Sequence, residues 1–322
     1  MSKFVRWPYI VSLLIAIGIV SQYQAIHDWI RLVNYDPPAA VVALADDITL
    51  TDKSRKLFYV NHPELQDRNT FNTSCSSRGE QTIVLGCYHP VDRGIFLFHV
   101  EDDRLMGVDQ VTAAHEVLHA AYDRLSDSKQ AEIDKLLQNF NDTGSYDERI
   151  KIIMASYQKY EPNDVVNEMH SIFATEVAGL PAELEQYYSQ YFKDRSKIVR
   201  YATDYQTEFT SRQNQVAAYD VQLKEMKQAI DSNSQSIERQ EVAIAGLRDQ
   251  LDRDRGSDNV EAFNRNVPVY NARIDQYNAL INRTKTLISD YNKTVTERNN
   301  LALQVTDLAR SIDSSFQSIE QQ

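Results

Sequence analysis

Two histidines and a glutamate lie close together in the segment TAAHEVLHAAYDRLS (112–126): His115, Glu116 and His119. On a helix, residues four apart share one face, so His115 and His119 can offer imidazole nitrogens to the same metal ion. Glu116 is rotated by about 100° from His115, beside such an ion rather than on it. Its carboxylate could take a proton from water and pass it to a leaving amine. The spacing predicts a zinc site that hydrolyses peptide bonds; an ordinary pair of core or surface histidines is the alternative.

A catalytic zinc needs a third protein ligand as well as an open position for water. Asp123 continues the spacing of four, but three ligands on one straight helix would span about 12 Å, too far for one ion. We therefore expect the third ligand on another helix. The segment NEMHSIFATE supplies Glu168, His170 and Glu176. Glu168 and Glu176 lie within about 80° of one another around that helix, so either could face the metal.

Peptide hydrolysis also needs a donor for the oxyanion of its transition state, a role that Tyr or His side chains can take. Tyr157, Tyr160 and His170 are the candidates, because they lie near Glu168 in the sequence. The segment IFLFHV (95–100) is predicted as a strand. It is either an edge strand that pairs with an extended substrate or an interior strand.

The sequence His115-Glu116-Val117-Leu118-His119, followed by a later helix with Asn167-Glu168, resembles the gluzincin metallopeptidases. The resemblance implies that His115, His119 and Glu168 bind zinc and that Glu116 is the general base. The Asn-Glu step and the following SIF resemble the thermolysin-like form of the third-ligand helix. Those enzymes carry an acid four residues after the ligand, where this chain has Ile172. The resemblance covers two short helices and implies a zincin-like fold.

The elements that must position these residues can be read from the composition along the chain. TIVLGCY (82–88) and IFLFHV are rich in β-branched and aromatic residues, which predicts two strands joined by the turn-like HPVDRG. The helix with the histidines is expected to start near Asp109, which suits a helix N-terminus. Further helical segments follow. The predicted fold is an α+β zincin-like domain over 35–200, mostly helical with a small sheet.

Beyond about residue 200, apolar residues recur every seventh position in two series separated by the polar DRDRGSDN (252–259). Such heptads predict two helices that fold back as an antiparallel coiled-coil hairpin over 201–322. The hairpin could act as a spacer, form a homo-oligomer or shield the cleft. The first series is Val216, Leu223, Ile230, Ile237, Ile244 and Leu251, and the second is Val267, Ile274, Ile281, Ile288, Val295, Ala302, Ala309 and Phe316.

The N-terminal segment 1–34 has Lys3 and Arg6 ahead of an apolar run over 9–20. This pattern predicts an uncleaved signal anchor, with a cleaved signal peptide as the alternative. With an anchor, the protein would be single-pass, its N-terminus cytoplasmic and its other domains extracytoplasmic. The membrane would then be a partner through this helix.

The two cysteines, Cys75 and Cys87, could close a small loop as a disulfide, which persists outside the cytosol. Two buried free thiols are the alternative. The net charge of −12 excludes nucleic acid as a partner, because such binding depends on basic patches that meet phosphates.

Together these features predict an extracytoplasmic, membrane-anchored zinc metallopeptidase that acts on a protein or peptide substrate. A zinc amidase acting on cell-wall peptide cross-links is chemically close to it. The alternative is a non-catalytic structural or adhesion coiled-coil protein of the cell envelope, with a structural or vestigial metal site. Glu116 favours the enzyme, because a structural site needs no general base and usually has four protein ligands with Cys among them.

Overall fold

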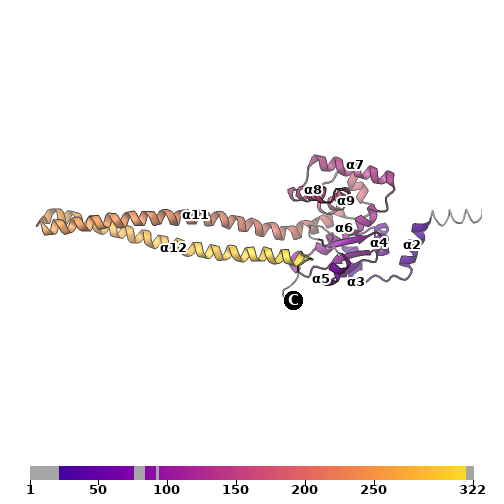
Figure 1. The fold of residues 1–322 in the computed structure, drawn as a ribbon, viewed down its shortest axis with the longest axis horizontal. Helices are drawn as coiled ribbons and strands as arrows, with labels where there is room; N and C mark the ends of the chain where they lie inside the picture. The colour runs from indigo at the N-terminus through magenta and orange to yellow at the C-terminus, as the bar shows by residue number, and fades with distance from the viewer. Residues whose placement is uncertain (1–21, 76–83, 92–93, 317–322) are drawn as a thin grey trace, which may run out of the picture. The chain divides into compact units, whose positions relative to one another are not determined.

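The computed structural model describes residues 22–75, 84–91 and 94–316. The chain divides into two units: unit 1 is residues 1–208 with 308–322, and unit 2 is residues 209–307 (Figure 1). Unit 1 holds the sheet and the shorter helices. Its described elements are α2 (Tyr23–Leu32), α3 (Ala39–Asp47), α4 (Asp52–Val60), β1 (Glu64–Gln66), α5 (Arg68–Ser74), β2 (Gly86–His89), β3 (Gly94–Phe98), α6 (Val108–Tyr122), α7 (Asp127–Thr143), α8 (Glu148–Tyr160), α9 (Val165–Glu176) and α10 (Ala182–Tyr188).

The sheet of unit 1 has the strand order β1-β3-β2, so the strand predicted over 95–100 is an interior strand. β2 pairs with β3 in antiparallel register, with Cys87 opposite Phe96. β1 pairs with β3 in parallel. Ile95 and Leu97 of β3 are fully buried, as expected for a central strand. The observed hairpin of β2 and β3 overlaps the two strands predicted over 82–88 and 95–100, whereas the three residues of β1 carry no recognisable strand pattern.

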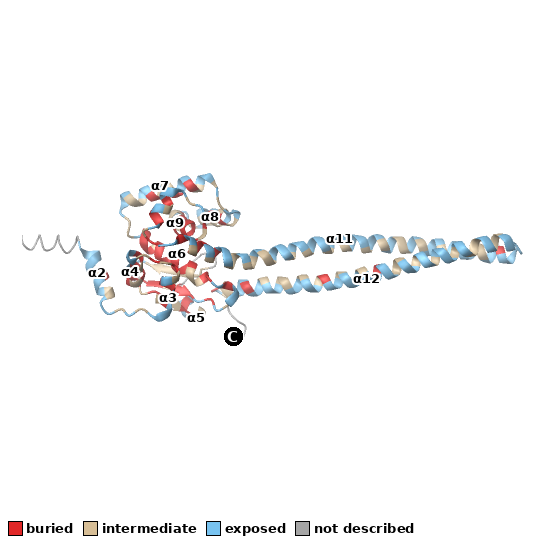
Figure 2. Ribbon diagram, turned by 180° about the vertical axis from the view of Figure 1, so that it is seen from behind, coloured by how far each residue is buried: buried red, intermediate tan, exposed pale blue. Residues whose placement is uncertain are grey.

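Helix α6 is the central element of unit 1, packed between α9 on one side and α4, β2 and β3 on others. Small side chains make this close packing possible: Ala113, Ala114 and Ala120 have no exposed surface. The helix begins after Gly107, whose φ of 103° lies in the left-handed region that glycine adopts without strain. Buried residues gather on α6 and α9 (Figure 2).

The prediction of a zincin-like α+β domain is wrong as a description of this fold. Helices account for most of the described chain, and the sheet consists of three strands of three to five residues. The reason is that the β-branched and aromatic runs are short, whereas apolar residues from α6 onward recur at helical spacing. The two long helices are compatible with the predicted helical hairpin.

These long helices are α11 (Arg195–Gly256) and α12 (Val260–Ile312), and most of their length forms unit 2. Within unit 2, Arg298 donates two hydrogen bonds to the carboxylate of Asp220, and Arg212 donates one to Gln304. Going from Arg298 to Gln304 along α12, the bonded residue of α11 moves back from Asp220 to Arg212. The two helices therefore run antiparallel. The first heptad series is half-buried throughout, from Val216 to Leu251.

The prediction of a single-pass membrane anchor over 1–34, with the localisation built on it, is corrected. No helix within the described residues is long and apolar enough to cross a bilayer. The described part of this segment contains α2, whose 10 residues would extend for only about 15 Å. α2 instead contacts the segment that follows α6. The carboxylate of its buried Asp28 accepts two hydrogen bonds from Arg124, two residues after the last residue of α6. The apolar run over 9–20 lies outside the described residues.

Candidate metal centre

Three ligand-type side chains converge where α6 packs on α9: His115 and His119 from α6, and Glu168 from α9. Their ligand atoms all lie within 4.8 Å of one another. Nε2 of His115 is 3.4 Å from Oε2 of Glu168, and Nε2 of His119 is 3.5 Å from Oε1. Two ligand atoms at about 2.0–2.1 Å from a tetrahedral zinc ion would be about 3.3–3.4 Å apart. The observed distances therefore fit one zinc-sized ion.

The imidazole of His119 is oriented by Asn167, the residue before Glu168. Nδ1 of His119 lies 3.0 Å from Oδ1 of Asn167. An amide oxygen can only accept, so Nδ1 is the donor and Nε2 is the ring nitrogen left to bind a metal. Nε2 faces Glu168, as a shared metal site requires. A hydrogen bond of this kind both fixes the ring and raises the basicity of the ligating nitrogen.

Glu168 is an unusual carboxylate because it is buried, with 13% of its side chain exposed, yet it favours its charged form. Burial alone would raise its pKa, but the contact with His115, the charges of the two histidines and the hydroxyl of Tyr157 outweigh it. The pKa falls to about 2. Within the described chain, the buried Oε2 makes no well-formed hydrogen bond. A cation bound beside this oxygen would offset the cost of burying its charge.

Glu116 also lies inside the protein, with 5% of its surface exposed, on the side of α6 that meets the sheet. Gly86 at the start of β2 makes room for it. A Cβ added at Gly86 would stand 2.7 Å from Cγ and Oε1 of Glu116, and 2.7 Å from Cγ2 of Thr112. The carboxylate therefore rests against the bare backbone of the strand.

The other predicted ligand, Glu176, lies elsewhere in unit 1. Its Oε2 accepts hydrogen bonds from Arg149 at 2.7 Å and from Gln206 at 2.8 Å. Eight residues separate it from Glu168, which moves it about 12 Å along α9. The crossing point of α6 on α9 therefore brings Glu168, and not Glu176, to the histidines.

The three candidate oxyanion donors have different surroundings. The hydroxyl of Tyr157 of α8 helps to lower the pKa of Glu168, so it lies close to the centre. Tyr160 is 47% exposed and its hydroxyl accepts a hydrogen bond from Lys159. His170 is fully buried, and its Nε2 lies 2.9 Å from the hydroxyl of Tyr187. Burial lowers the pKa of His170 to about 3, which keeps the ring neutral within the core.

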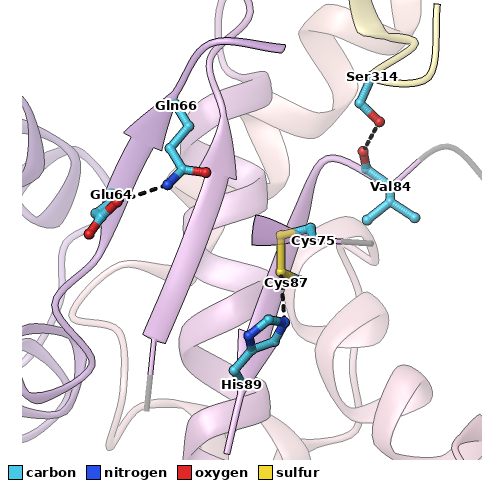
Figure 3. The surroundings of a disulfide bond; sticks show 7 residues. All are labelled: Glu64, Gln66, Cys75, Val84, Cys87, His89 and Ser314. Atoms are coloured by element: carbon cyan, nitrogen blue, oxygen red, sulfur yellow. Dashed lines mark hydrogen bonds between the residues drawn. A yellow bond between two sulfur atoms is a disulfide. The ribbon is translucent and has the colours of Figure 1, made fainter. Parts of the chain in front are cut away.

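The predicted disulfide between Cys75 and Cys87 is present and joins the end of α5 to β2 (Figure 3). Nε2 of His89, two residues farther along β2, lies 3.5 Å from Sγ of Cys87. On the other side of the disulfide, the hydroxyl of Ser314 donates to the carbonyl of Val84 at 2.7 Å. The strand next to Glu116 is thus tied to two other parts of unit 1.

Reasoning from the sequence alone missed two residues that lie against His119 and Glu116. In the sequence, Asn167 is noted only as part of the Asn167-Glu168 step. Its hydrogen bond to His119 depends on how α9 crosses α6. Gly86 carries a weak signal, because a glycine within a strand pattern often marks a close approach of another group. Neither role follows from spacing along a single element.

No family model, no curated protein and no solved structure matches the chain. The zincin-like fold therefore has no support from a structural relative, and the metallopeptidase assignment has none from a related sequence. The residues of the centre and their geometry are the basis on which a function can be inferred.

Proposed function

We propose that this chain is a zinc-dependent metallopeptidase that hydrolyses peptide bonds of a protein or peptide substrate. The observation that carries the proposal is the convergence of His115, His119 and Glu168 within 4.8 Å of one another. Two imidazoles and one carboxylate leave an open position in a tetrahedral shell, as catalytic zinc sites do. A structural site would use a fourth protein ligand, and the two cysteines are engaged with one another.

The donor set favours zinc over the harder cations. Calcium and magnesium prefer six or more oxygen ligands, whereas this centre offers two nitrogens and one carboxylate. The bound ion would supply a Lewis acid that polarises the substrate carbonyl and lowers the pKa of water to about 7.

The chain's own residues then have separate roles. His115, His119 and Glu168 hold the ion, and Asn167 fixes the ring of His119. Glu116 takes the proton from the attacking water and delivers it to the departing amine. Its burial removes competing solvent around that proton transfer. The hydroxyl of Tyr157, which already contacts Glu168, is the residue best placed to donate to the developing oxyanion.

The decisive experiment compares wild type with Glu116→Gln for zinc content and for cleavage of casein or a peptide library. Wild type should hold about one zinc ion per chain and cleave the substrate. Glu116→Gln should keep the zinc and lose about 10²–10⁴-fold in rate, the usual contribution of a general base. Equal rates in the two proteins would refute the role of Glu116.

A second pair of variants tests the ligand set. Glu168→Ala should lose the zinc, whereas Glu176→Ala should retain it, because Glu176 is bonded to Arg149 and Gln206. Each change removes one half-buried carboxylate from α9, so Glu176→Ala is a matched control for Glu168→Ala. Wild type that binds zinc but cleaves nothing would instead indicate a structural metal site.

A further inference from the structure

The position of Glu116 depends on a strand that other parts of unit 1 hold in place. Glu116 belongs to α6, but its Cγ and Oε1 lie where a Cβ on Gly86 would stand. The backbone of β2 therefore forms one wall of the space that the carboxylate occupies. Any shift of β2 toward α6 would displace Glu116, and a shift away would release it.

Three contacts hold this strand from different sides, and we call them the β2 clamp. The disulfide between Cys75 and Cys87 joins β2 to α5. Ser314, which is 6% exposed, donates to the carbonyl of Val84, two residues before β2 begins. The hydroxyl of Tyr88 donates to Asp123 at the end of α6, at 3.1 Å. The strand is thus fixed both to α6 and to elements that lie outside the candidate centre.

The contact through Ser314 is part of a larger attachment that involves the end of α12 and the residues after it. Asn72 of α5 donates to the carbonyl of Ser314 at 2.7 Å. Arg68 donates to the carbonyls of Arg310 and Phe316, and its guanidinium lies 5.3 Å from the ring centre of Phe98. This attachment makes Ser314 a fixed point against which β2 is held.

We propose that Gly86 is a positioning residue for the hydrolysis, and that the β2 clamp sets where Glu116 stands relative to the attacking water. The inference rests on the proposed function. It assigns Gly86, Ser314 and the disulfide a part in catalysis without contact to the metal or the substrate. The physical basis is that an error of about 1 Å in a catalytic group costs about 100-fold in rate.

The test begins with Gly86→Ala and its matched control Gly179→Ala, since nothing lies within 4 Å of a Cβ at Gly179. Gly86→Ala should keep about one zinc ion per chain and lose about 100-fold in kcat, with KM changed by less than about twofold. Gly179→Ala should match wild type. A full kcat in Gly86→Ala overturns the inference while the proposed function stands.

A double-mutant cycle separates positioning from general damage. If Gly86 acts through Glu116, adding Gly86→Ala to Glu116→Gln should leave the residual rate unchanged within about twofold. A merely structural role would lower the residual rate by the same factor as in wild type, and that result overturns the inference.

Ser314→Ala tests the β2 clamp without introducing a clash. Ser315→Ala is its control, because Ser315 is exposed and its hydrogen bonds within the described residues go to Asp313. Ser314→Ala should lower kcat by about 10-fold with zinc retained, and Ser315→Ala should not. Unchanged kcat in Ser314→Ala removes the β2 clamp from the mechanism. Wild type that binds zinc without cleaving any substrate refutes the proposed function instead.

Discussion

Removing the side-chain amide of Asn167 should weaken zinc binding without removing a ligand. Oδ1 of Asn167 accepts the proton of His119 Nδ1 at 3.0 Å, in a half-buried setting. When a cation withdraws charge from the ring, this bond becomes charge-assisted and contributes about 1.5–3 kcal/mol. That range corresponds to about 10–100-fold in zinc affinity, the usual effect of losing such a partner.

The assay is a competition titration of zinc against a chelator of known affinity, performed on wild type, Asn167→Ala and Asn163→Ala. Asn163 is exposed and lies four residues before Asn167, so the same substitution there should leave the zinc Kd unchanged. Asn167→Asp keeps an acceptor for Nδ1 and should bind zinc at least as tightly as wild type. A zinc Kd in Asn167→Ala equal to that of wild type would refute the role of Asn167 in orienting His119 for the metal.

Three further predictions concern stability. Replacing Cys75 and Cys87 by serine should lower the free energy of unfolding by about 3 kcal/mol, measured by urea denaturation, because the disulfide closes a loop of twelve residues; an unchanged midpoint would contradict the entropic estimate. Arg195→Leu should lower the free energy of unfolding by about 3 kcal/mol, because its buried guanidinium donates to three backbone carbonyls at the end of α9, those of Ala174, Val177 and Ala178. Arg200→Leu, at an exposed site, is the control. The pKa of Asp102 is lowered below its ordinary value of 3.8, chiefly by the hydrogen bonds from Arg104. The charged carboxylate therefore stabilises the fold above pH 3.8, and this contribution is lost as the pH falls below that value. Asp102→Asn should lose less stability than wild type between pH 5 and pH 2, and equal losses in the two proteins would show that this carboxylate does not contribute.

How far the centre could be predicted depends on whether its residues share an element. His115, Glu116 and His119 follow from spacing on one helix, because helical geometry fixes their directions. The third ligand could not be chosen, because Glu168 and Glu176 lie on nearly the same side of α9 and only the crossing point of α6 distinguishes them. That crossing depends on tertiary packing, including the alanines of α6.

The fold shows the same division between local and non-local information. The hairpin of β2 and β3 and the pair of long helices follow from composition and periodicity. The second heptad series does so only in part, because Ile288 and Ala309 are exposed and Phe316 lies beyond the end of α12. β1 does not, because a strand of three residues is defined by its partner β3 and not by its own sequence. The zincin-like fold was inferred from two short motifs, and motifs of this length describe a site without determining the fold around it.

The division of the chain has a consequence for how this protein can vary. Residues 208 and 308, which border unit 2, both belong to unit 1, so unit 2 is an insertion within a discontinuous unit 1. Arg195 precedes the insertion and Ser314 follows it, and each is hydrogen-bonded to other parts of unit 1. The antiparallel helices could therefore lose or gain matched heptads, seven residues from each, while the register of the remaining seam is preserved. The reach of the hairpin is a property that can change independently of the candidate metal centre.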